Sequence, residues 1–477
     1  MRSVARLAWL LERSRFSSSR GTSWLDVLAV FGFAVATAIL LLLSGASSLF
    51  IRRADQAGSV LSPPVVQALD SPQLGSAFFS SYQAVFAFAF LVTIPPALSL
   101  AASAASSAAR SRLEQLRLLR LFGLGRARGW LLVLVVVFSQ FAAGVAAGTL
   151  LYFTSFYLWQ LLEIQGTVVS ATEVMISSAS WLNTVFLLAV ATAGAALVVL
   201  SFSSLDSSRN RGAGEFRFFA PFPLLVSLLV VALSALVEAV LSAEGFVGDL
   251  TALVAAVTAV VVFVGPGLLY VLGRFLLRSS RLDLTLAGAS LSSRSRALFV
   301  TASPAALVMF MALSLGAQPQ EFLSAIAQTD GVDLPQSQVP VFIAELLRRN
   351  LVVGLLLVCV AVVLLSLVSV SLDHAGGIIY RRDQAQTLFL LGVDPTLLHR
   401  ARLWQLLCAQ FSAFALAVVC AAAVVLPDTS VTELSWEPLF LVFVVFAVTV
   451  VASLVANRWL APLQDQVLTG DSRSRLL

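Results

Sequence analysis

The sequence has no lysine, few histidines and cysteines, and few charged residues of either sign. All 30 basic residues are arginine, and only 12% of the 477 residues are charged. A Walker A loop that binds phosphate requires a lysine, and so does a Schiff base. Neither chemistry is therefore available to this chain. Any ATP hydrolysis that serves it must take place on another subunit, which would bind the ATP and Mg²⁺, and we expect no cofactor here.

The three cysteines and two histidines lack the spacing of metal ligands. Cys359, Cys408 and Cys420 lie inside apolar stretches, and His374 and His399 lie near the ends of such stretches. We interpret them as packing and interfacial residues, and we expect neither a disulfide framework nor a metal site. The net charge of +5 does not require a nucleic-acid partner, because arginines that border membrane spans account for it.

Apolar residues dominate the rest of the sequence. They make up 59% of the chain, and the mean hydropathy is +0.94, which excludes an ordinary water-soluble protein. Stretches of about 20 residues, the length that crosses a bilayer, recur along the chain. We predict an all-α integral membrane protein with ten transmembrane helices. The predicted spans are about 25–50, 77–108, 130–159, 183–205, 220–243, 247–277, 297–318, 350–372, 403–426 and 438–459.

The arginines predict the orientation of these spans. Ten crossings put both termini on one side, and if that side is the cytoplasm, 26 of the 30 arginines lie at or face it. Only Arg52, Arg53, Arg348 and Arg349 fall outside. The positive-inside rule therefore predicts cytoplasmic termini. Arginine without lysine, together with abundant alanine and valine, is typical of a GC-rich bacterium, so we expect the bacterial cytoplasmic membrane.

Two predicted inner segments share a sequence pattern. Arg112–Gly123 follows the second span and Arg381–Gly392 follows the eighth, and the two glycines are 269 residues apart. Aligned on them, both segments place an arginine, an acid, a glutamine and a leucine at equal positions. This predicts two parallel four-span repeats, residues 1–210 and 282–477, which flank a central pair of spans in residues 211–281.

Each repeated segment is expected to form a short helix that its glycine ends. In the second copy, Asp394 can cap the next helix and Pro395 suits its first turn. In the first copy, Leu116, Leu119 and Phe122 form an apolar stripe that we expect to face a cytosolic partner. An alternative is a basic amphipathic loop that rests on anionic lipid headgroups.

At these residues the sequence resembles the FtsX-like permease family, the membrane subunits of MacB, lipoprotein-release and bacitracin-resistance type ABC transporters. That family carries an Arg-Arg-Glu-x-x-Leu-Leu-Arg-x-x-Gly segment after the second span of each unit, which couples the permease to its ATPase. The resemblance implies coupling helices at 110–129 and 379–398. The candidate ATPase-coupling residues are Arg112, Gln115, Leu116, Leu118, Leu119, Arg120 and Gly123 in the first, and Gln384, Leu388, Phe389 and Gly392 in the second.

The match to the family is incomplete. The usual glutamate is glutamine in both copies, and Phe389 replaces an arginine, which implies a weaker grip by the second copy. The large outer domain of the family is missing, because the loops at 51–76 and 319–349 are short. An extracytoplasmic partner protein would have to bind these loops.

The resemblance implies a permease subunit of the mechanotransmission type that serves two ATPase subunits. Such machines extract amphiphiles from the outer leaflet, handle membrane-active peptides, or transmit force to envelope proteins. Membrane lipids are expected partners and nucleic acid is not. Two alternatives are an ion-coupled secondary transporter, which should carry several acids or histidines near the midplane, and a membrane scaffold with vestigial coupling helices.

Helix-breaking residues occur within two spans. Pro95 and Pro96 lie in the middle of the second span, and Gly265, Pro266 and Gly267 lie in the sixth. Each group predicts a kink, because proline removes a backbone hydrogen bond. The kink is either a static packing feature or a hinge.

Three polar side chains lie within apolar stretches. Glu238 is near the outer end of the fifth span and is either a solvated interfacial carboxylate or a relay or substrate site. Gln140 and Gln410 occupy similar depths in the third and ninth spans, and we interpret them as hydrogen-bonding links between helices.

Overall fold

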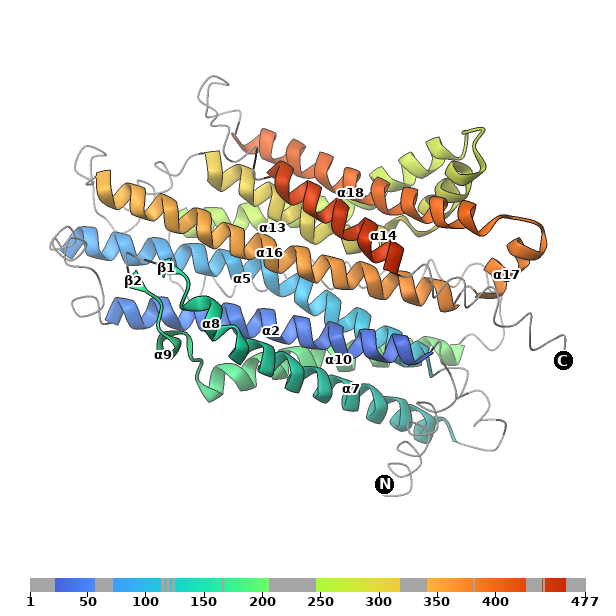
Figure 1. Cartoon of the computed structure of the whole chain (residues 1–477), viewed down its shortest axis with the longest axis horizontal. Coiled ribbons are helices and arrows are strands. Elements are labelled where there is room, and N and C mark those ends of the chain that lie inside the picture. The colour runs from blue at the N-terminus through green and yellow to red at the C-terminus, as the bar shows by residue number, and fades with distance from the viewer. Residues whose placement is uncertain are drawn as a thin grey trace.

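The fold is a bundle of long helices, seen in a computed structural model (Figure 1). The structure describes residues 22–55, 72–112, 116, 121, 125–164, 167–205, 246–317, 341–380, 382–425, 440 and 442–459. The long helices are α2 (Thr22–Asp55), α5 (Pro72–Arg110), α7 (Arg126–Thr154), α10 (Ser178–Leu205), α13 (Phe246–Leu276), α14 (Leu282–Ala317), α16 (Val341–Tyr380), α18 (Pro395–Val425) and an unlabelled helix, Val442–Trp459. The short elements are α8 (Phe156–Trp159), β1 (Glu163–Ile164), β2 (Thr167–Val168), α9 (Ala171–Val174) and α17 (Arg382–Leu390).

Seven stretches in the described residues are long and apolar enough to cross a membrane. They are Leu25–Arg53, Val92–Arg110, Ala127–Trp159, Ser178–Ser201, Leu356–Ile378, Pro395–Ala423 and Val442–Trp459. The expectation of a helical, multi-pass membrane protein is thereby confirmed. The helix α13 contributes a shorter apolar stretch, Phe263–Leu276, and α14 occupies the seventh predicted span without being among the seven. The fifth predicted span, 220–243, lies outside the described residues.

One pair of helix starts in the two halves of the chain has the spacing of the repeated pattern. Helix α7 starts at Arg126 and α18 at Pro395, which is 269 residues further along the chain. The contacts are also alike, because α2 packs against α5 and α7, while α14 packs against α16 and α18.

Two clusters of buried apolar side chains form the interior. The first cluster lies mainly among α2, α5, α7 and α10, and the second mainly among α13, α14, α16 and α18. Helices α5 and α16 pack against each other where the two clusters meet. Each lends side chains to the other half, because Leu365, Val368 and Leu372 of α16 join the first cluster and Val92 of α5 joins the second.

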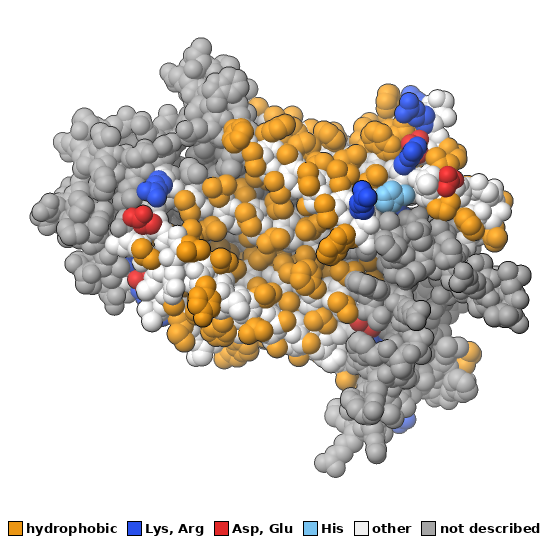
Figure 2. All heavy atoms as spheres, in the orientation of Figure 1, with side chains coloured by type: hydrophobic (Ala, Val, Ile, Leu, Met, Phe, Trp, Pro, Cys, Tyr) orange, Lys and Arg blue, Asp and Glu red, His pale blue; other side chains and the backbone are white. Residues whose placement is uncertain are grey.

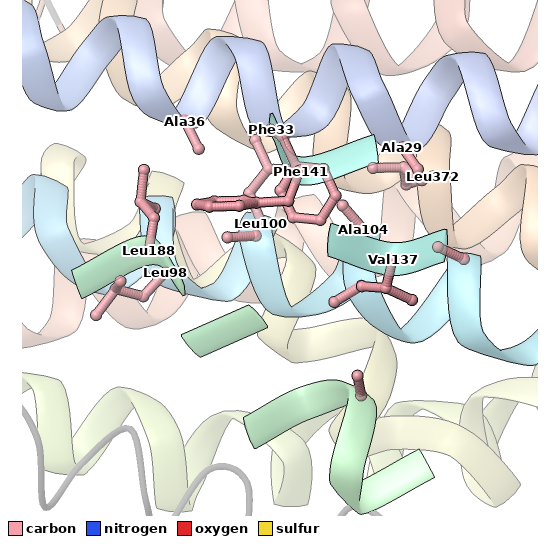
Figure 3. Packing of buried hydrophobic residues seen from close by; sticks show 14 of the residues in the cluster. Ala29, Phe33, Ala36, Leu98, Leu100, Ala104, Val137, Phe141, Leu188 and Leu372 are labelled. Atoms are coloured by element: carbon pink, nitrogen blue, oxygen red, sulfur yellow. The ribbon is translucent and has the colours of Figure 1, made fainter. Parts of the chain in front are cut away.

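Small residues let α2 and α7 approach closely. A Cβ atom on Gly144 would lie 2.4 Å from Cβ of Phe33, and one on Gly148 would lie 2.5 Å from the carbonyl oxygen of Ala34. This G-x-x-x-G spacing permits backbone contact between membrane helices. The ring of Phe33 meets that of Phe141 edge to face, with centroids 5.5 Å apart, in the first cluster (Figure 3).

The predicted helix breakers lie inside continuous helices. Pro95 and Pro96 are within α5, whose axis changes direction partway along in Figure 1, and Pro266 is within α13. A break in backbone geometry occurs instead at Arg294 of α14, with φ −130° and ψ 23°. It separates a lead-in segment from the rest of α14, and the lead-in packs tightly on α13, where a Cβ on Gly288 would lie 2.7 Å from the carbonyl oxygen of Gly273.

Candidate functional sites at the two ends of the bundle

A buried charge pair lies at one end of the bundle, which we call the Asp26 end. The side chain of Arg112 is 2% exposed and donates to Asp26, with Nη2 3.3 Å from Oδ2. The other carboxylate oxygen of Asp26 accepts a hydrogen bond of 3.0 Å from Nε2 of Gln140. These three side chains join α2, the second residue after α5, and α7. Because burying an arginine is costly without an anionic partner, Asp26 fixes where Arg112 lies.

Leu116 anchors the segment that follows α5. Its side chain is 2% exposed and belongs to the first cluster, although the sequence places it in a stripe open to a partner. The reason is that an amphipathic segment at the end of a bundle buries its apolar residues against the nearest apolar surface. Leu121, five residues later, is 83% exposed. The segment therefore has one anchored position and one open position.

The second repeated segment forms the short helix α17, between α16 and α18. It ends as the sequence predicts, with Gly392 at φ +87°, a conformation that favours glycine. The amide of Val393 donates to the carbonyl of Leu388 and that of Gly392 donates to the carbonyl of Phe389, both at 3.0 Å, which is a Schellman arrangement. Leu390 and Leu391 are 81% and 75% exposed.

Helix α18 restarts at once through the side chain of Asp394. Its Oδ1 accepts from the amide of Thr396 at 3.0 Å, and its Oδ2 accepts from the hydroxyl of Thr396 at 2.7 Å. The hydrogen bond from the Thr396 hydroxyl has the larger effect and the one from the Thr396 amide the smaller, and both lower the pKa of the Asp394 carboxyl. Pro395 is the first residue of the helix, where its missing N–H costs nothing. The turn between α17 and α18 is therefore tightly defined.

The two segments share one feature and differ in another. Leu121 and Leu390 are 269 residues apart, and both are more than four-fifths exposed. The charge pair, however, has no equivalent, because the position that matches Asp26 is Ser295 and the one that matches Gln140 is Ala409. Helix α17 packs mainly against α16 and lies at the right-hand end of the bundle in Figure 1.

A small folded unit covers the opposite end of α2, which we call the Arg53 end. We name it the cap, and it consists of α8, the antiparallel pair β1 and β2, and α9. Arg53 is 1% exposed and donates to Oε2 of Glu173 from Nη2 at 2.8 Å and from Nε at 3.0 Å. It also donates to the carbonyl oxygens of Ile164 and Val168. One guanidinium thus joins α2 to the hairpin and to α9.

Neighbouring side chains hold the cap at further points. Arg52 donates to the carbonyl oxygens of Thr172 and Met175, the latter at 2.9 Å. The hydroxyl of Tyr152 on α7 donates to the carbonyl of Val174 at 2.7 Å and accepts from the amide of Ile176 at 3.3 Å. Beneath these contacts lies a separate apolar cluster made of Ala46, Leu49, Trp159, Ile164, Val169 and Val174. The cap is therefore fixed to α2 and α7.

One exposed contact joins the cap to the other half of the chain. Arg349 of α16 lies 3.9 Å from Glu163 of β1, and both side chains are more than half exposed. Such a pair contributes little to stability. Among the described residues, the buried polar contacts of the cap are thus with α2 and α7.

The remaining candidates from the sequence have varied positions. Gln384 lies in α17, Leu388 is half-buried and Phe389 is 40% exposed. Gln410 is 2% exposed, and its Oε1 accepts no hydrogen bond from the described part of the chain. Gly265 and Pro266 are buried, and Gly267 is exposed. The candidates outside the described residues are Gln115, Leu118, Leu119, Arg120, Gly123 and Glu238, as are most of the loops at 51–76 and 319–349.

Sequence reasoning missed Asp26 and the cap. Asp26 is the second residue of the first predicted span, and an acid at the border of a span near several arginines is a signal for an ion pair. In the predicted orientation, Arg52 and Arg53 depart from the positive-inside rule, and Glu163 and Glu173 lie in another loop predicted on the same side. A charge that breaks the rule calls for a partner of opposite sign, which here is Glu173.

No protein-family model matches the chain, and no curated protein and no solved structure matches it.

Proposed function

We propose that this protein is the permease subunit of an ABC transporter complex of the mechanotransmission type, in the cytoplasmic membrane of a bacterium. A separate ATPase would dock at the Asp26 end, with two copies for each permease. The work would be done at the Arg53 end, on a lipid-like or peptide substrate or by force on an envelope protein. The proposal rests on the resemblance to the FtsX-like family, and it includes ten spans and two repeats.

One observation carries the proposal. Leucines at equivalent positions, Leu121 and Leu390, are both exposed where the chain passes between two long helices. These leucines are not buried in the bundle, and they do not belong to a membrane-crossing stretch. An exposed leucine in such a position favours contact with another molecule. Two such leucines at matching places suit a partner with two like subunits, as an ATPase dimer has.

The anchored part of the first segment provides a path for force. Arg112 ties the segment to α2 and, through Asp26 and Gln140, to α7. Helices α2 and α7 touch along Gly144 and Gly148, so they are expected to move together. At their far end both hold the cap, through Arg53 and Tyr152. In this proposal, Arg112 and Leu116 act as tethers, while Leu121 and Leu390 touch the ATPase.

The test is retention of an ATPase during purification. We would purify the tagged protein from its own host and look for a copurified subunit that carries a Walker A sequence and hydrolyses ATP. The double variant Leu121→Asp with Leu390→Asp should lose that subunit, because each change puts a charge into the contact. Val168→Asp is the matched control, since the side chain of Val168 is 64% exposed at the Arg53 end, and it should retain the subunit.

Two results would contradict the proposal. The first is equal retention of the ATPase by the double variant and the control. The second is the absence of any ATPase together with uptake or release that follows an ion gradient, which would favour the secondary transporter. A folded protein that has neither property would favour the scaffold.

A further inference from the structure

We propose that the cap is a membrane-interface element whose exposed apolar side chains lie in the lipid headgroup region at the Arg53 end. The surface in question consists of Tyr157 and Leu158 of α8 and Leu161 just after it. These side chains are 76%, 65% and 81% exposed. The partner is phospholipid, and the inference does not depend on an ATPase.

The exposed side chains are not needed to fold the cap. Trp159, Ile164 and Val174 point inward and form the apolar cluster under the cap with Leu49. Arg53 and Glu173 satisfy each other within the same unit. The inner side of the cap is therefore complete, and the outward apolar residues remain to be covered by something else.

The length of α7 places α8 at the right depth. Its 29 residues extend about 44 Å at 1.5 Å per residue, and a bilayer with both headgroup regions is about 40–45 Å thick. The helix ends at Thr154, and the hydroxyl of Ser155 bonds back to the carbonyl of Tyr152 at 2.6 Å. With Arg126 near one surface, the turn at Ser155 falls in the headgroup region of the opposite leaflet. Helix α8 starts directly after this turn.

The surface is continuous with one that must face lipid. Leu150, Leu151 and Phe153 are 65%, 46% and 48% exposed on the last turns of α7, inside a stretch that is long and apolar enough to cross the membrane. Figure 2 shows hydrophobic side chains over α7 and α8, beside charged ones at the left end. The exposed apolar side chains continue from the last turns of α7 into α8. If a protein covered α8, the boundary between lipid and protein would have to lie within this patch.

The residue types also suit an interface. Aromatic rings gather at the turn, where the ring of Phe156 lies 5.0 Å from that of Tyr152 and 5.6 Å from that of Phe153, centroid to centroid. Tyrosine and tryptophan are enriched where membrane meets water, because one end of the ring is apolar and the other polar. The cap also has exposed polar residues, Glu163 and Ser170, outside α8.

The experiment places a fluorescent probe either in the apolar surface of the cap or at an exposed polar position of the cap. In a background with Cys359, Cys408 and Cys420 changed to alanine, Leu161→Cys or Leu158→Cys is labelled with an environment-sensitive dye. Ser170→Cys, exposed in the same cap, is the matched control. The full chain is reconstituted in phosphatidylcholine and phosphatidylglycerol vesicles, and quenching by a spin-labelled phospholipid is compared with quenching by iodide on both sides of the membrane.

We expect emission from the probe at position 161 to shift to shorter wavelength and to be quenched by the spin-labelled lipid more than by iodide. The probe at position 170 should show the reverse. Equal iodide quenching at both positions would overturn the proposal, because the surface would then face water. Protection of position 161 from both quenchers would also overturn it, because a protein would then cover the surface. The probe at position 158 guards against a local effect of one substitution.

Discussion

The guanidinium of Arg53 lies 2.8 Å from the carboxylate of Glu173, although 120 residues separate them in the chain. This contact ties the end of α2 to a cap that follows in the chain only after α5 and α7 have crossed the bundle twice more. In the predicted orientation, Arg53 lies on the side of the membrane where the positive-inside rule predicts few arginines, and its charge is neutralised inside the protein.

Replacing Arg53 should destabilise the protein far more than replacing Arg349. Arg53→Ala leaves the largely buried carboxylate of Glu173 without its cation, and breaking such a pair costs about 3 kcal/mol. Arg349→Ala removes an exposed pair with a separation of 3.9 Å and should cost less than about 1 kcal/mol. Thermal unfolding in detergent measures both. Equal losses would show that Arg53 does not hold the cap.

The charge pair at the Asp26 end should behave as one unit. We expect Asp26→Ala, Arg112→Ala and the double variant to show a coupling energy of about 1–3 kcal/mol, because each single change strands the other charge. Chemical denaturation of the three variants measures it. Effects that simply add would mean that the two side chains do not interact. Ser295→Ala, at the position equivalent to Asp26, is the control and should show no coupling with Arg112→Ala.

Two glycines in one span should respond oppositely to alanine. A Cβ on Gly265 would lie 2.0 Å from the ring of Phe299, which is itself buried. Gly265→Ala should therefore push α13 from α14 and cost about 1–3 kcal/mol. A Cβ on Gly267 meets nothing described within 4 Å, so Gly267→Ala should be neutral or stabilise the helix by up to about 1 kcal/mol. Thermal unfolding of the two variants decides. If Gly267→Ala lowered the stability as much as Gly265→Ala, the glycines of α13 would be needed for flexibility of the helix and not for close packing.

The turn before α18 should weaken in acid. Hydrogen bonds from Thr396 make the pKa of Asp394 lower in the folded protein than its ordinary value of 3.8. Its stabilising effect is therefore complete above about pH 4 and is lost as the pH falls through the folded pKa. The stability difference between the natural protein and Asp394→Asn should be constant near neutral pH and change only in this acidic range. Thr396→Val should shift the change toward higher pH, and a difference that changes near pH 6 would contradict this origin.

The sequence predicts the helices well because their signals are local. The apolar runs place the spans, Gly392 ends α17, and Asp394 with Pro395 starts α18, each through the chemistry of a few adjacent residues. The starts of α7 at Arg126 and α18 at Pro395 have the spacing of the repeated pattern.

The cap and the exposure of the segment after α5 are harder to predict, because they depend on contacts between residues far apart in the sequence. Strands β1 and β2 have two residues each, too few for an alternating pattern, and Arg53 binds them across more than 110 residues. An amphipathic segment also does not specify what its apolar side meets. Leu116 meets the bundle, and Leu121 does not. Knowing which surface is nearest requires the folded arrangement of α2, α5 and α7.

The exchange of side chains between α5 and α16 bears on how the chain can be divided. Val92 completes the interior of the second half, and Leu365, Val368 and Leu372 complete that of the first. If the gene were split between codons 205 and 246, each fragment would lack the apolar side chains that the other fragment contributes to its interior. We expect neither fragment to persist when made alone, and we expect the two to rescue each other when made in the same cell.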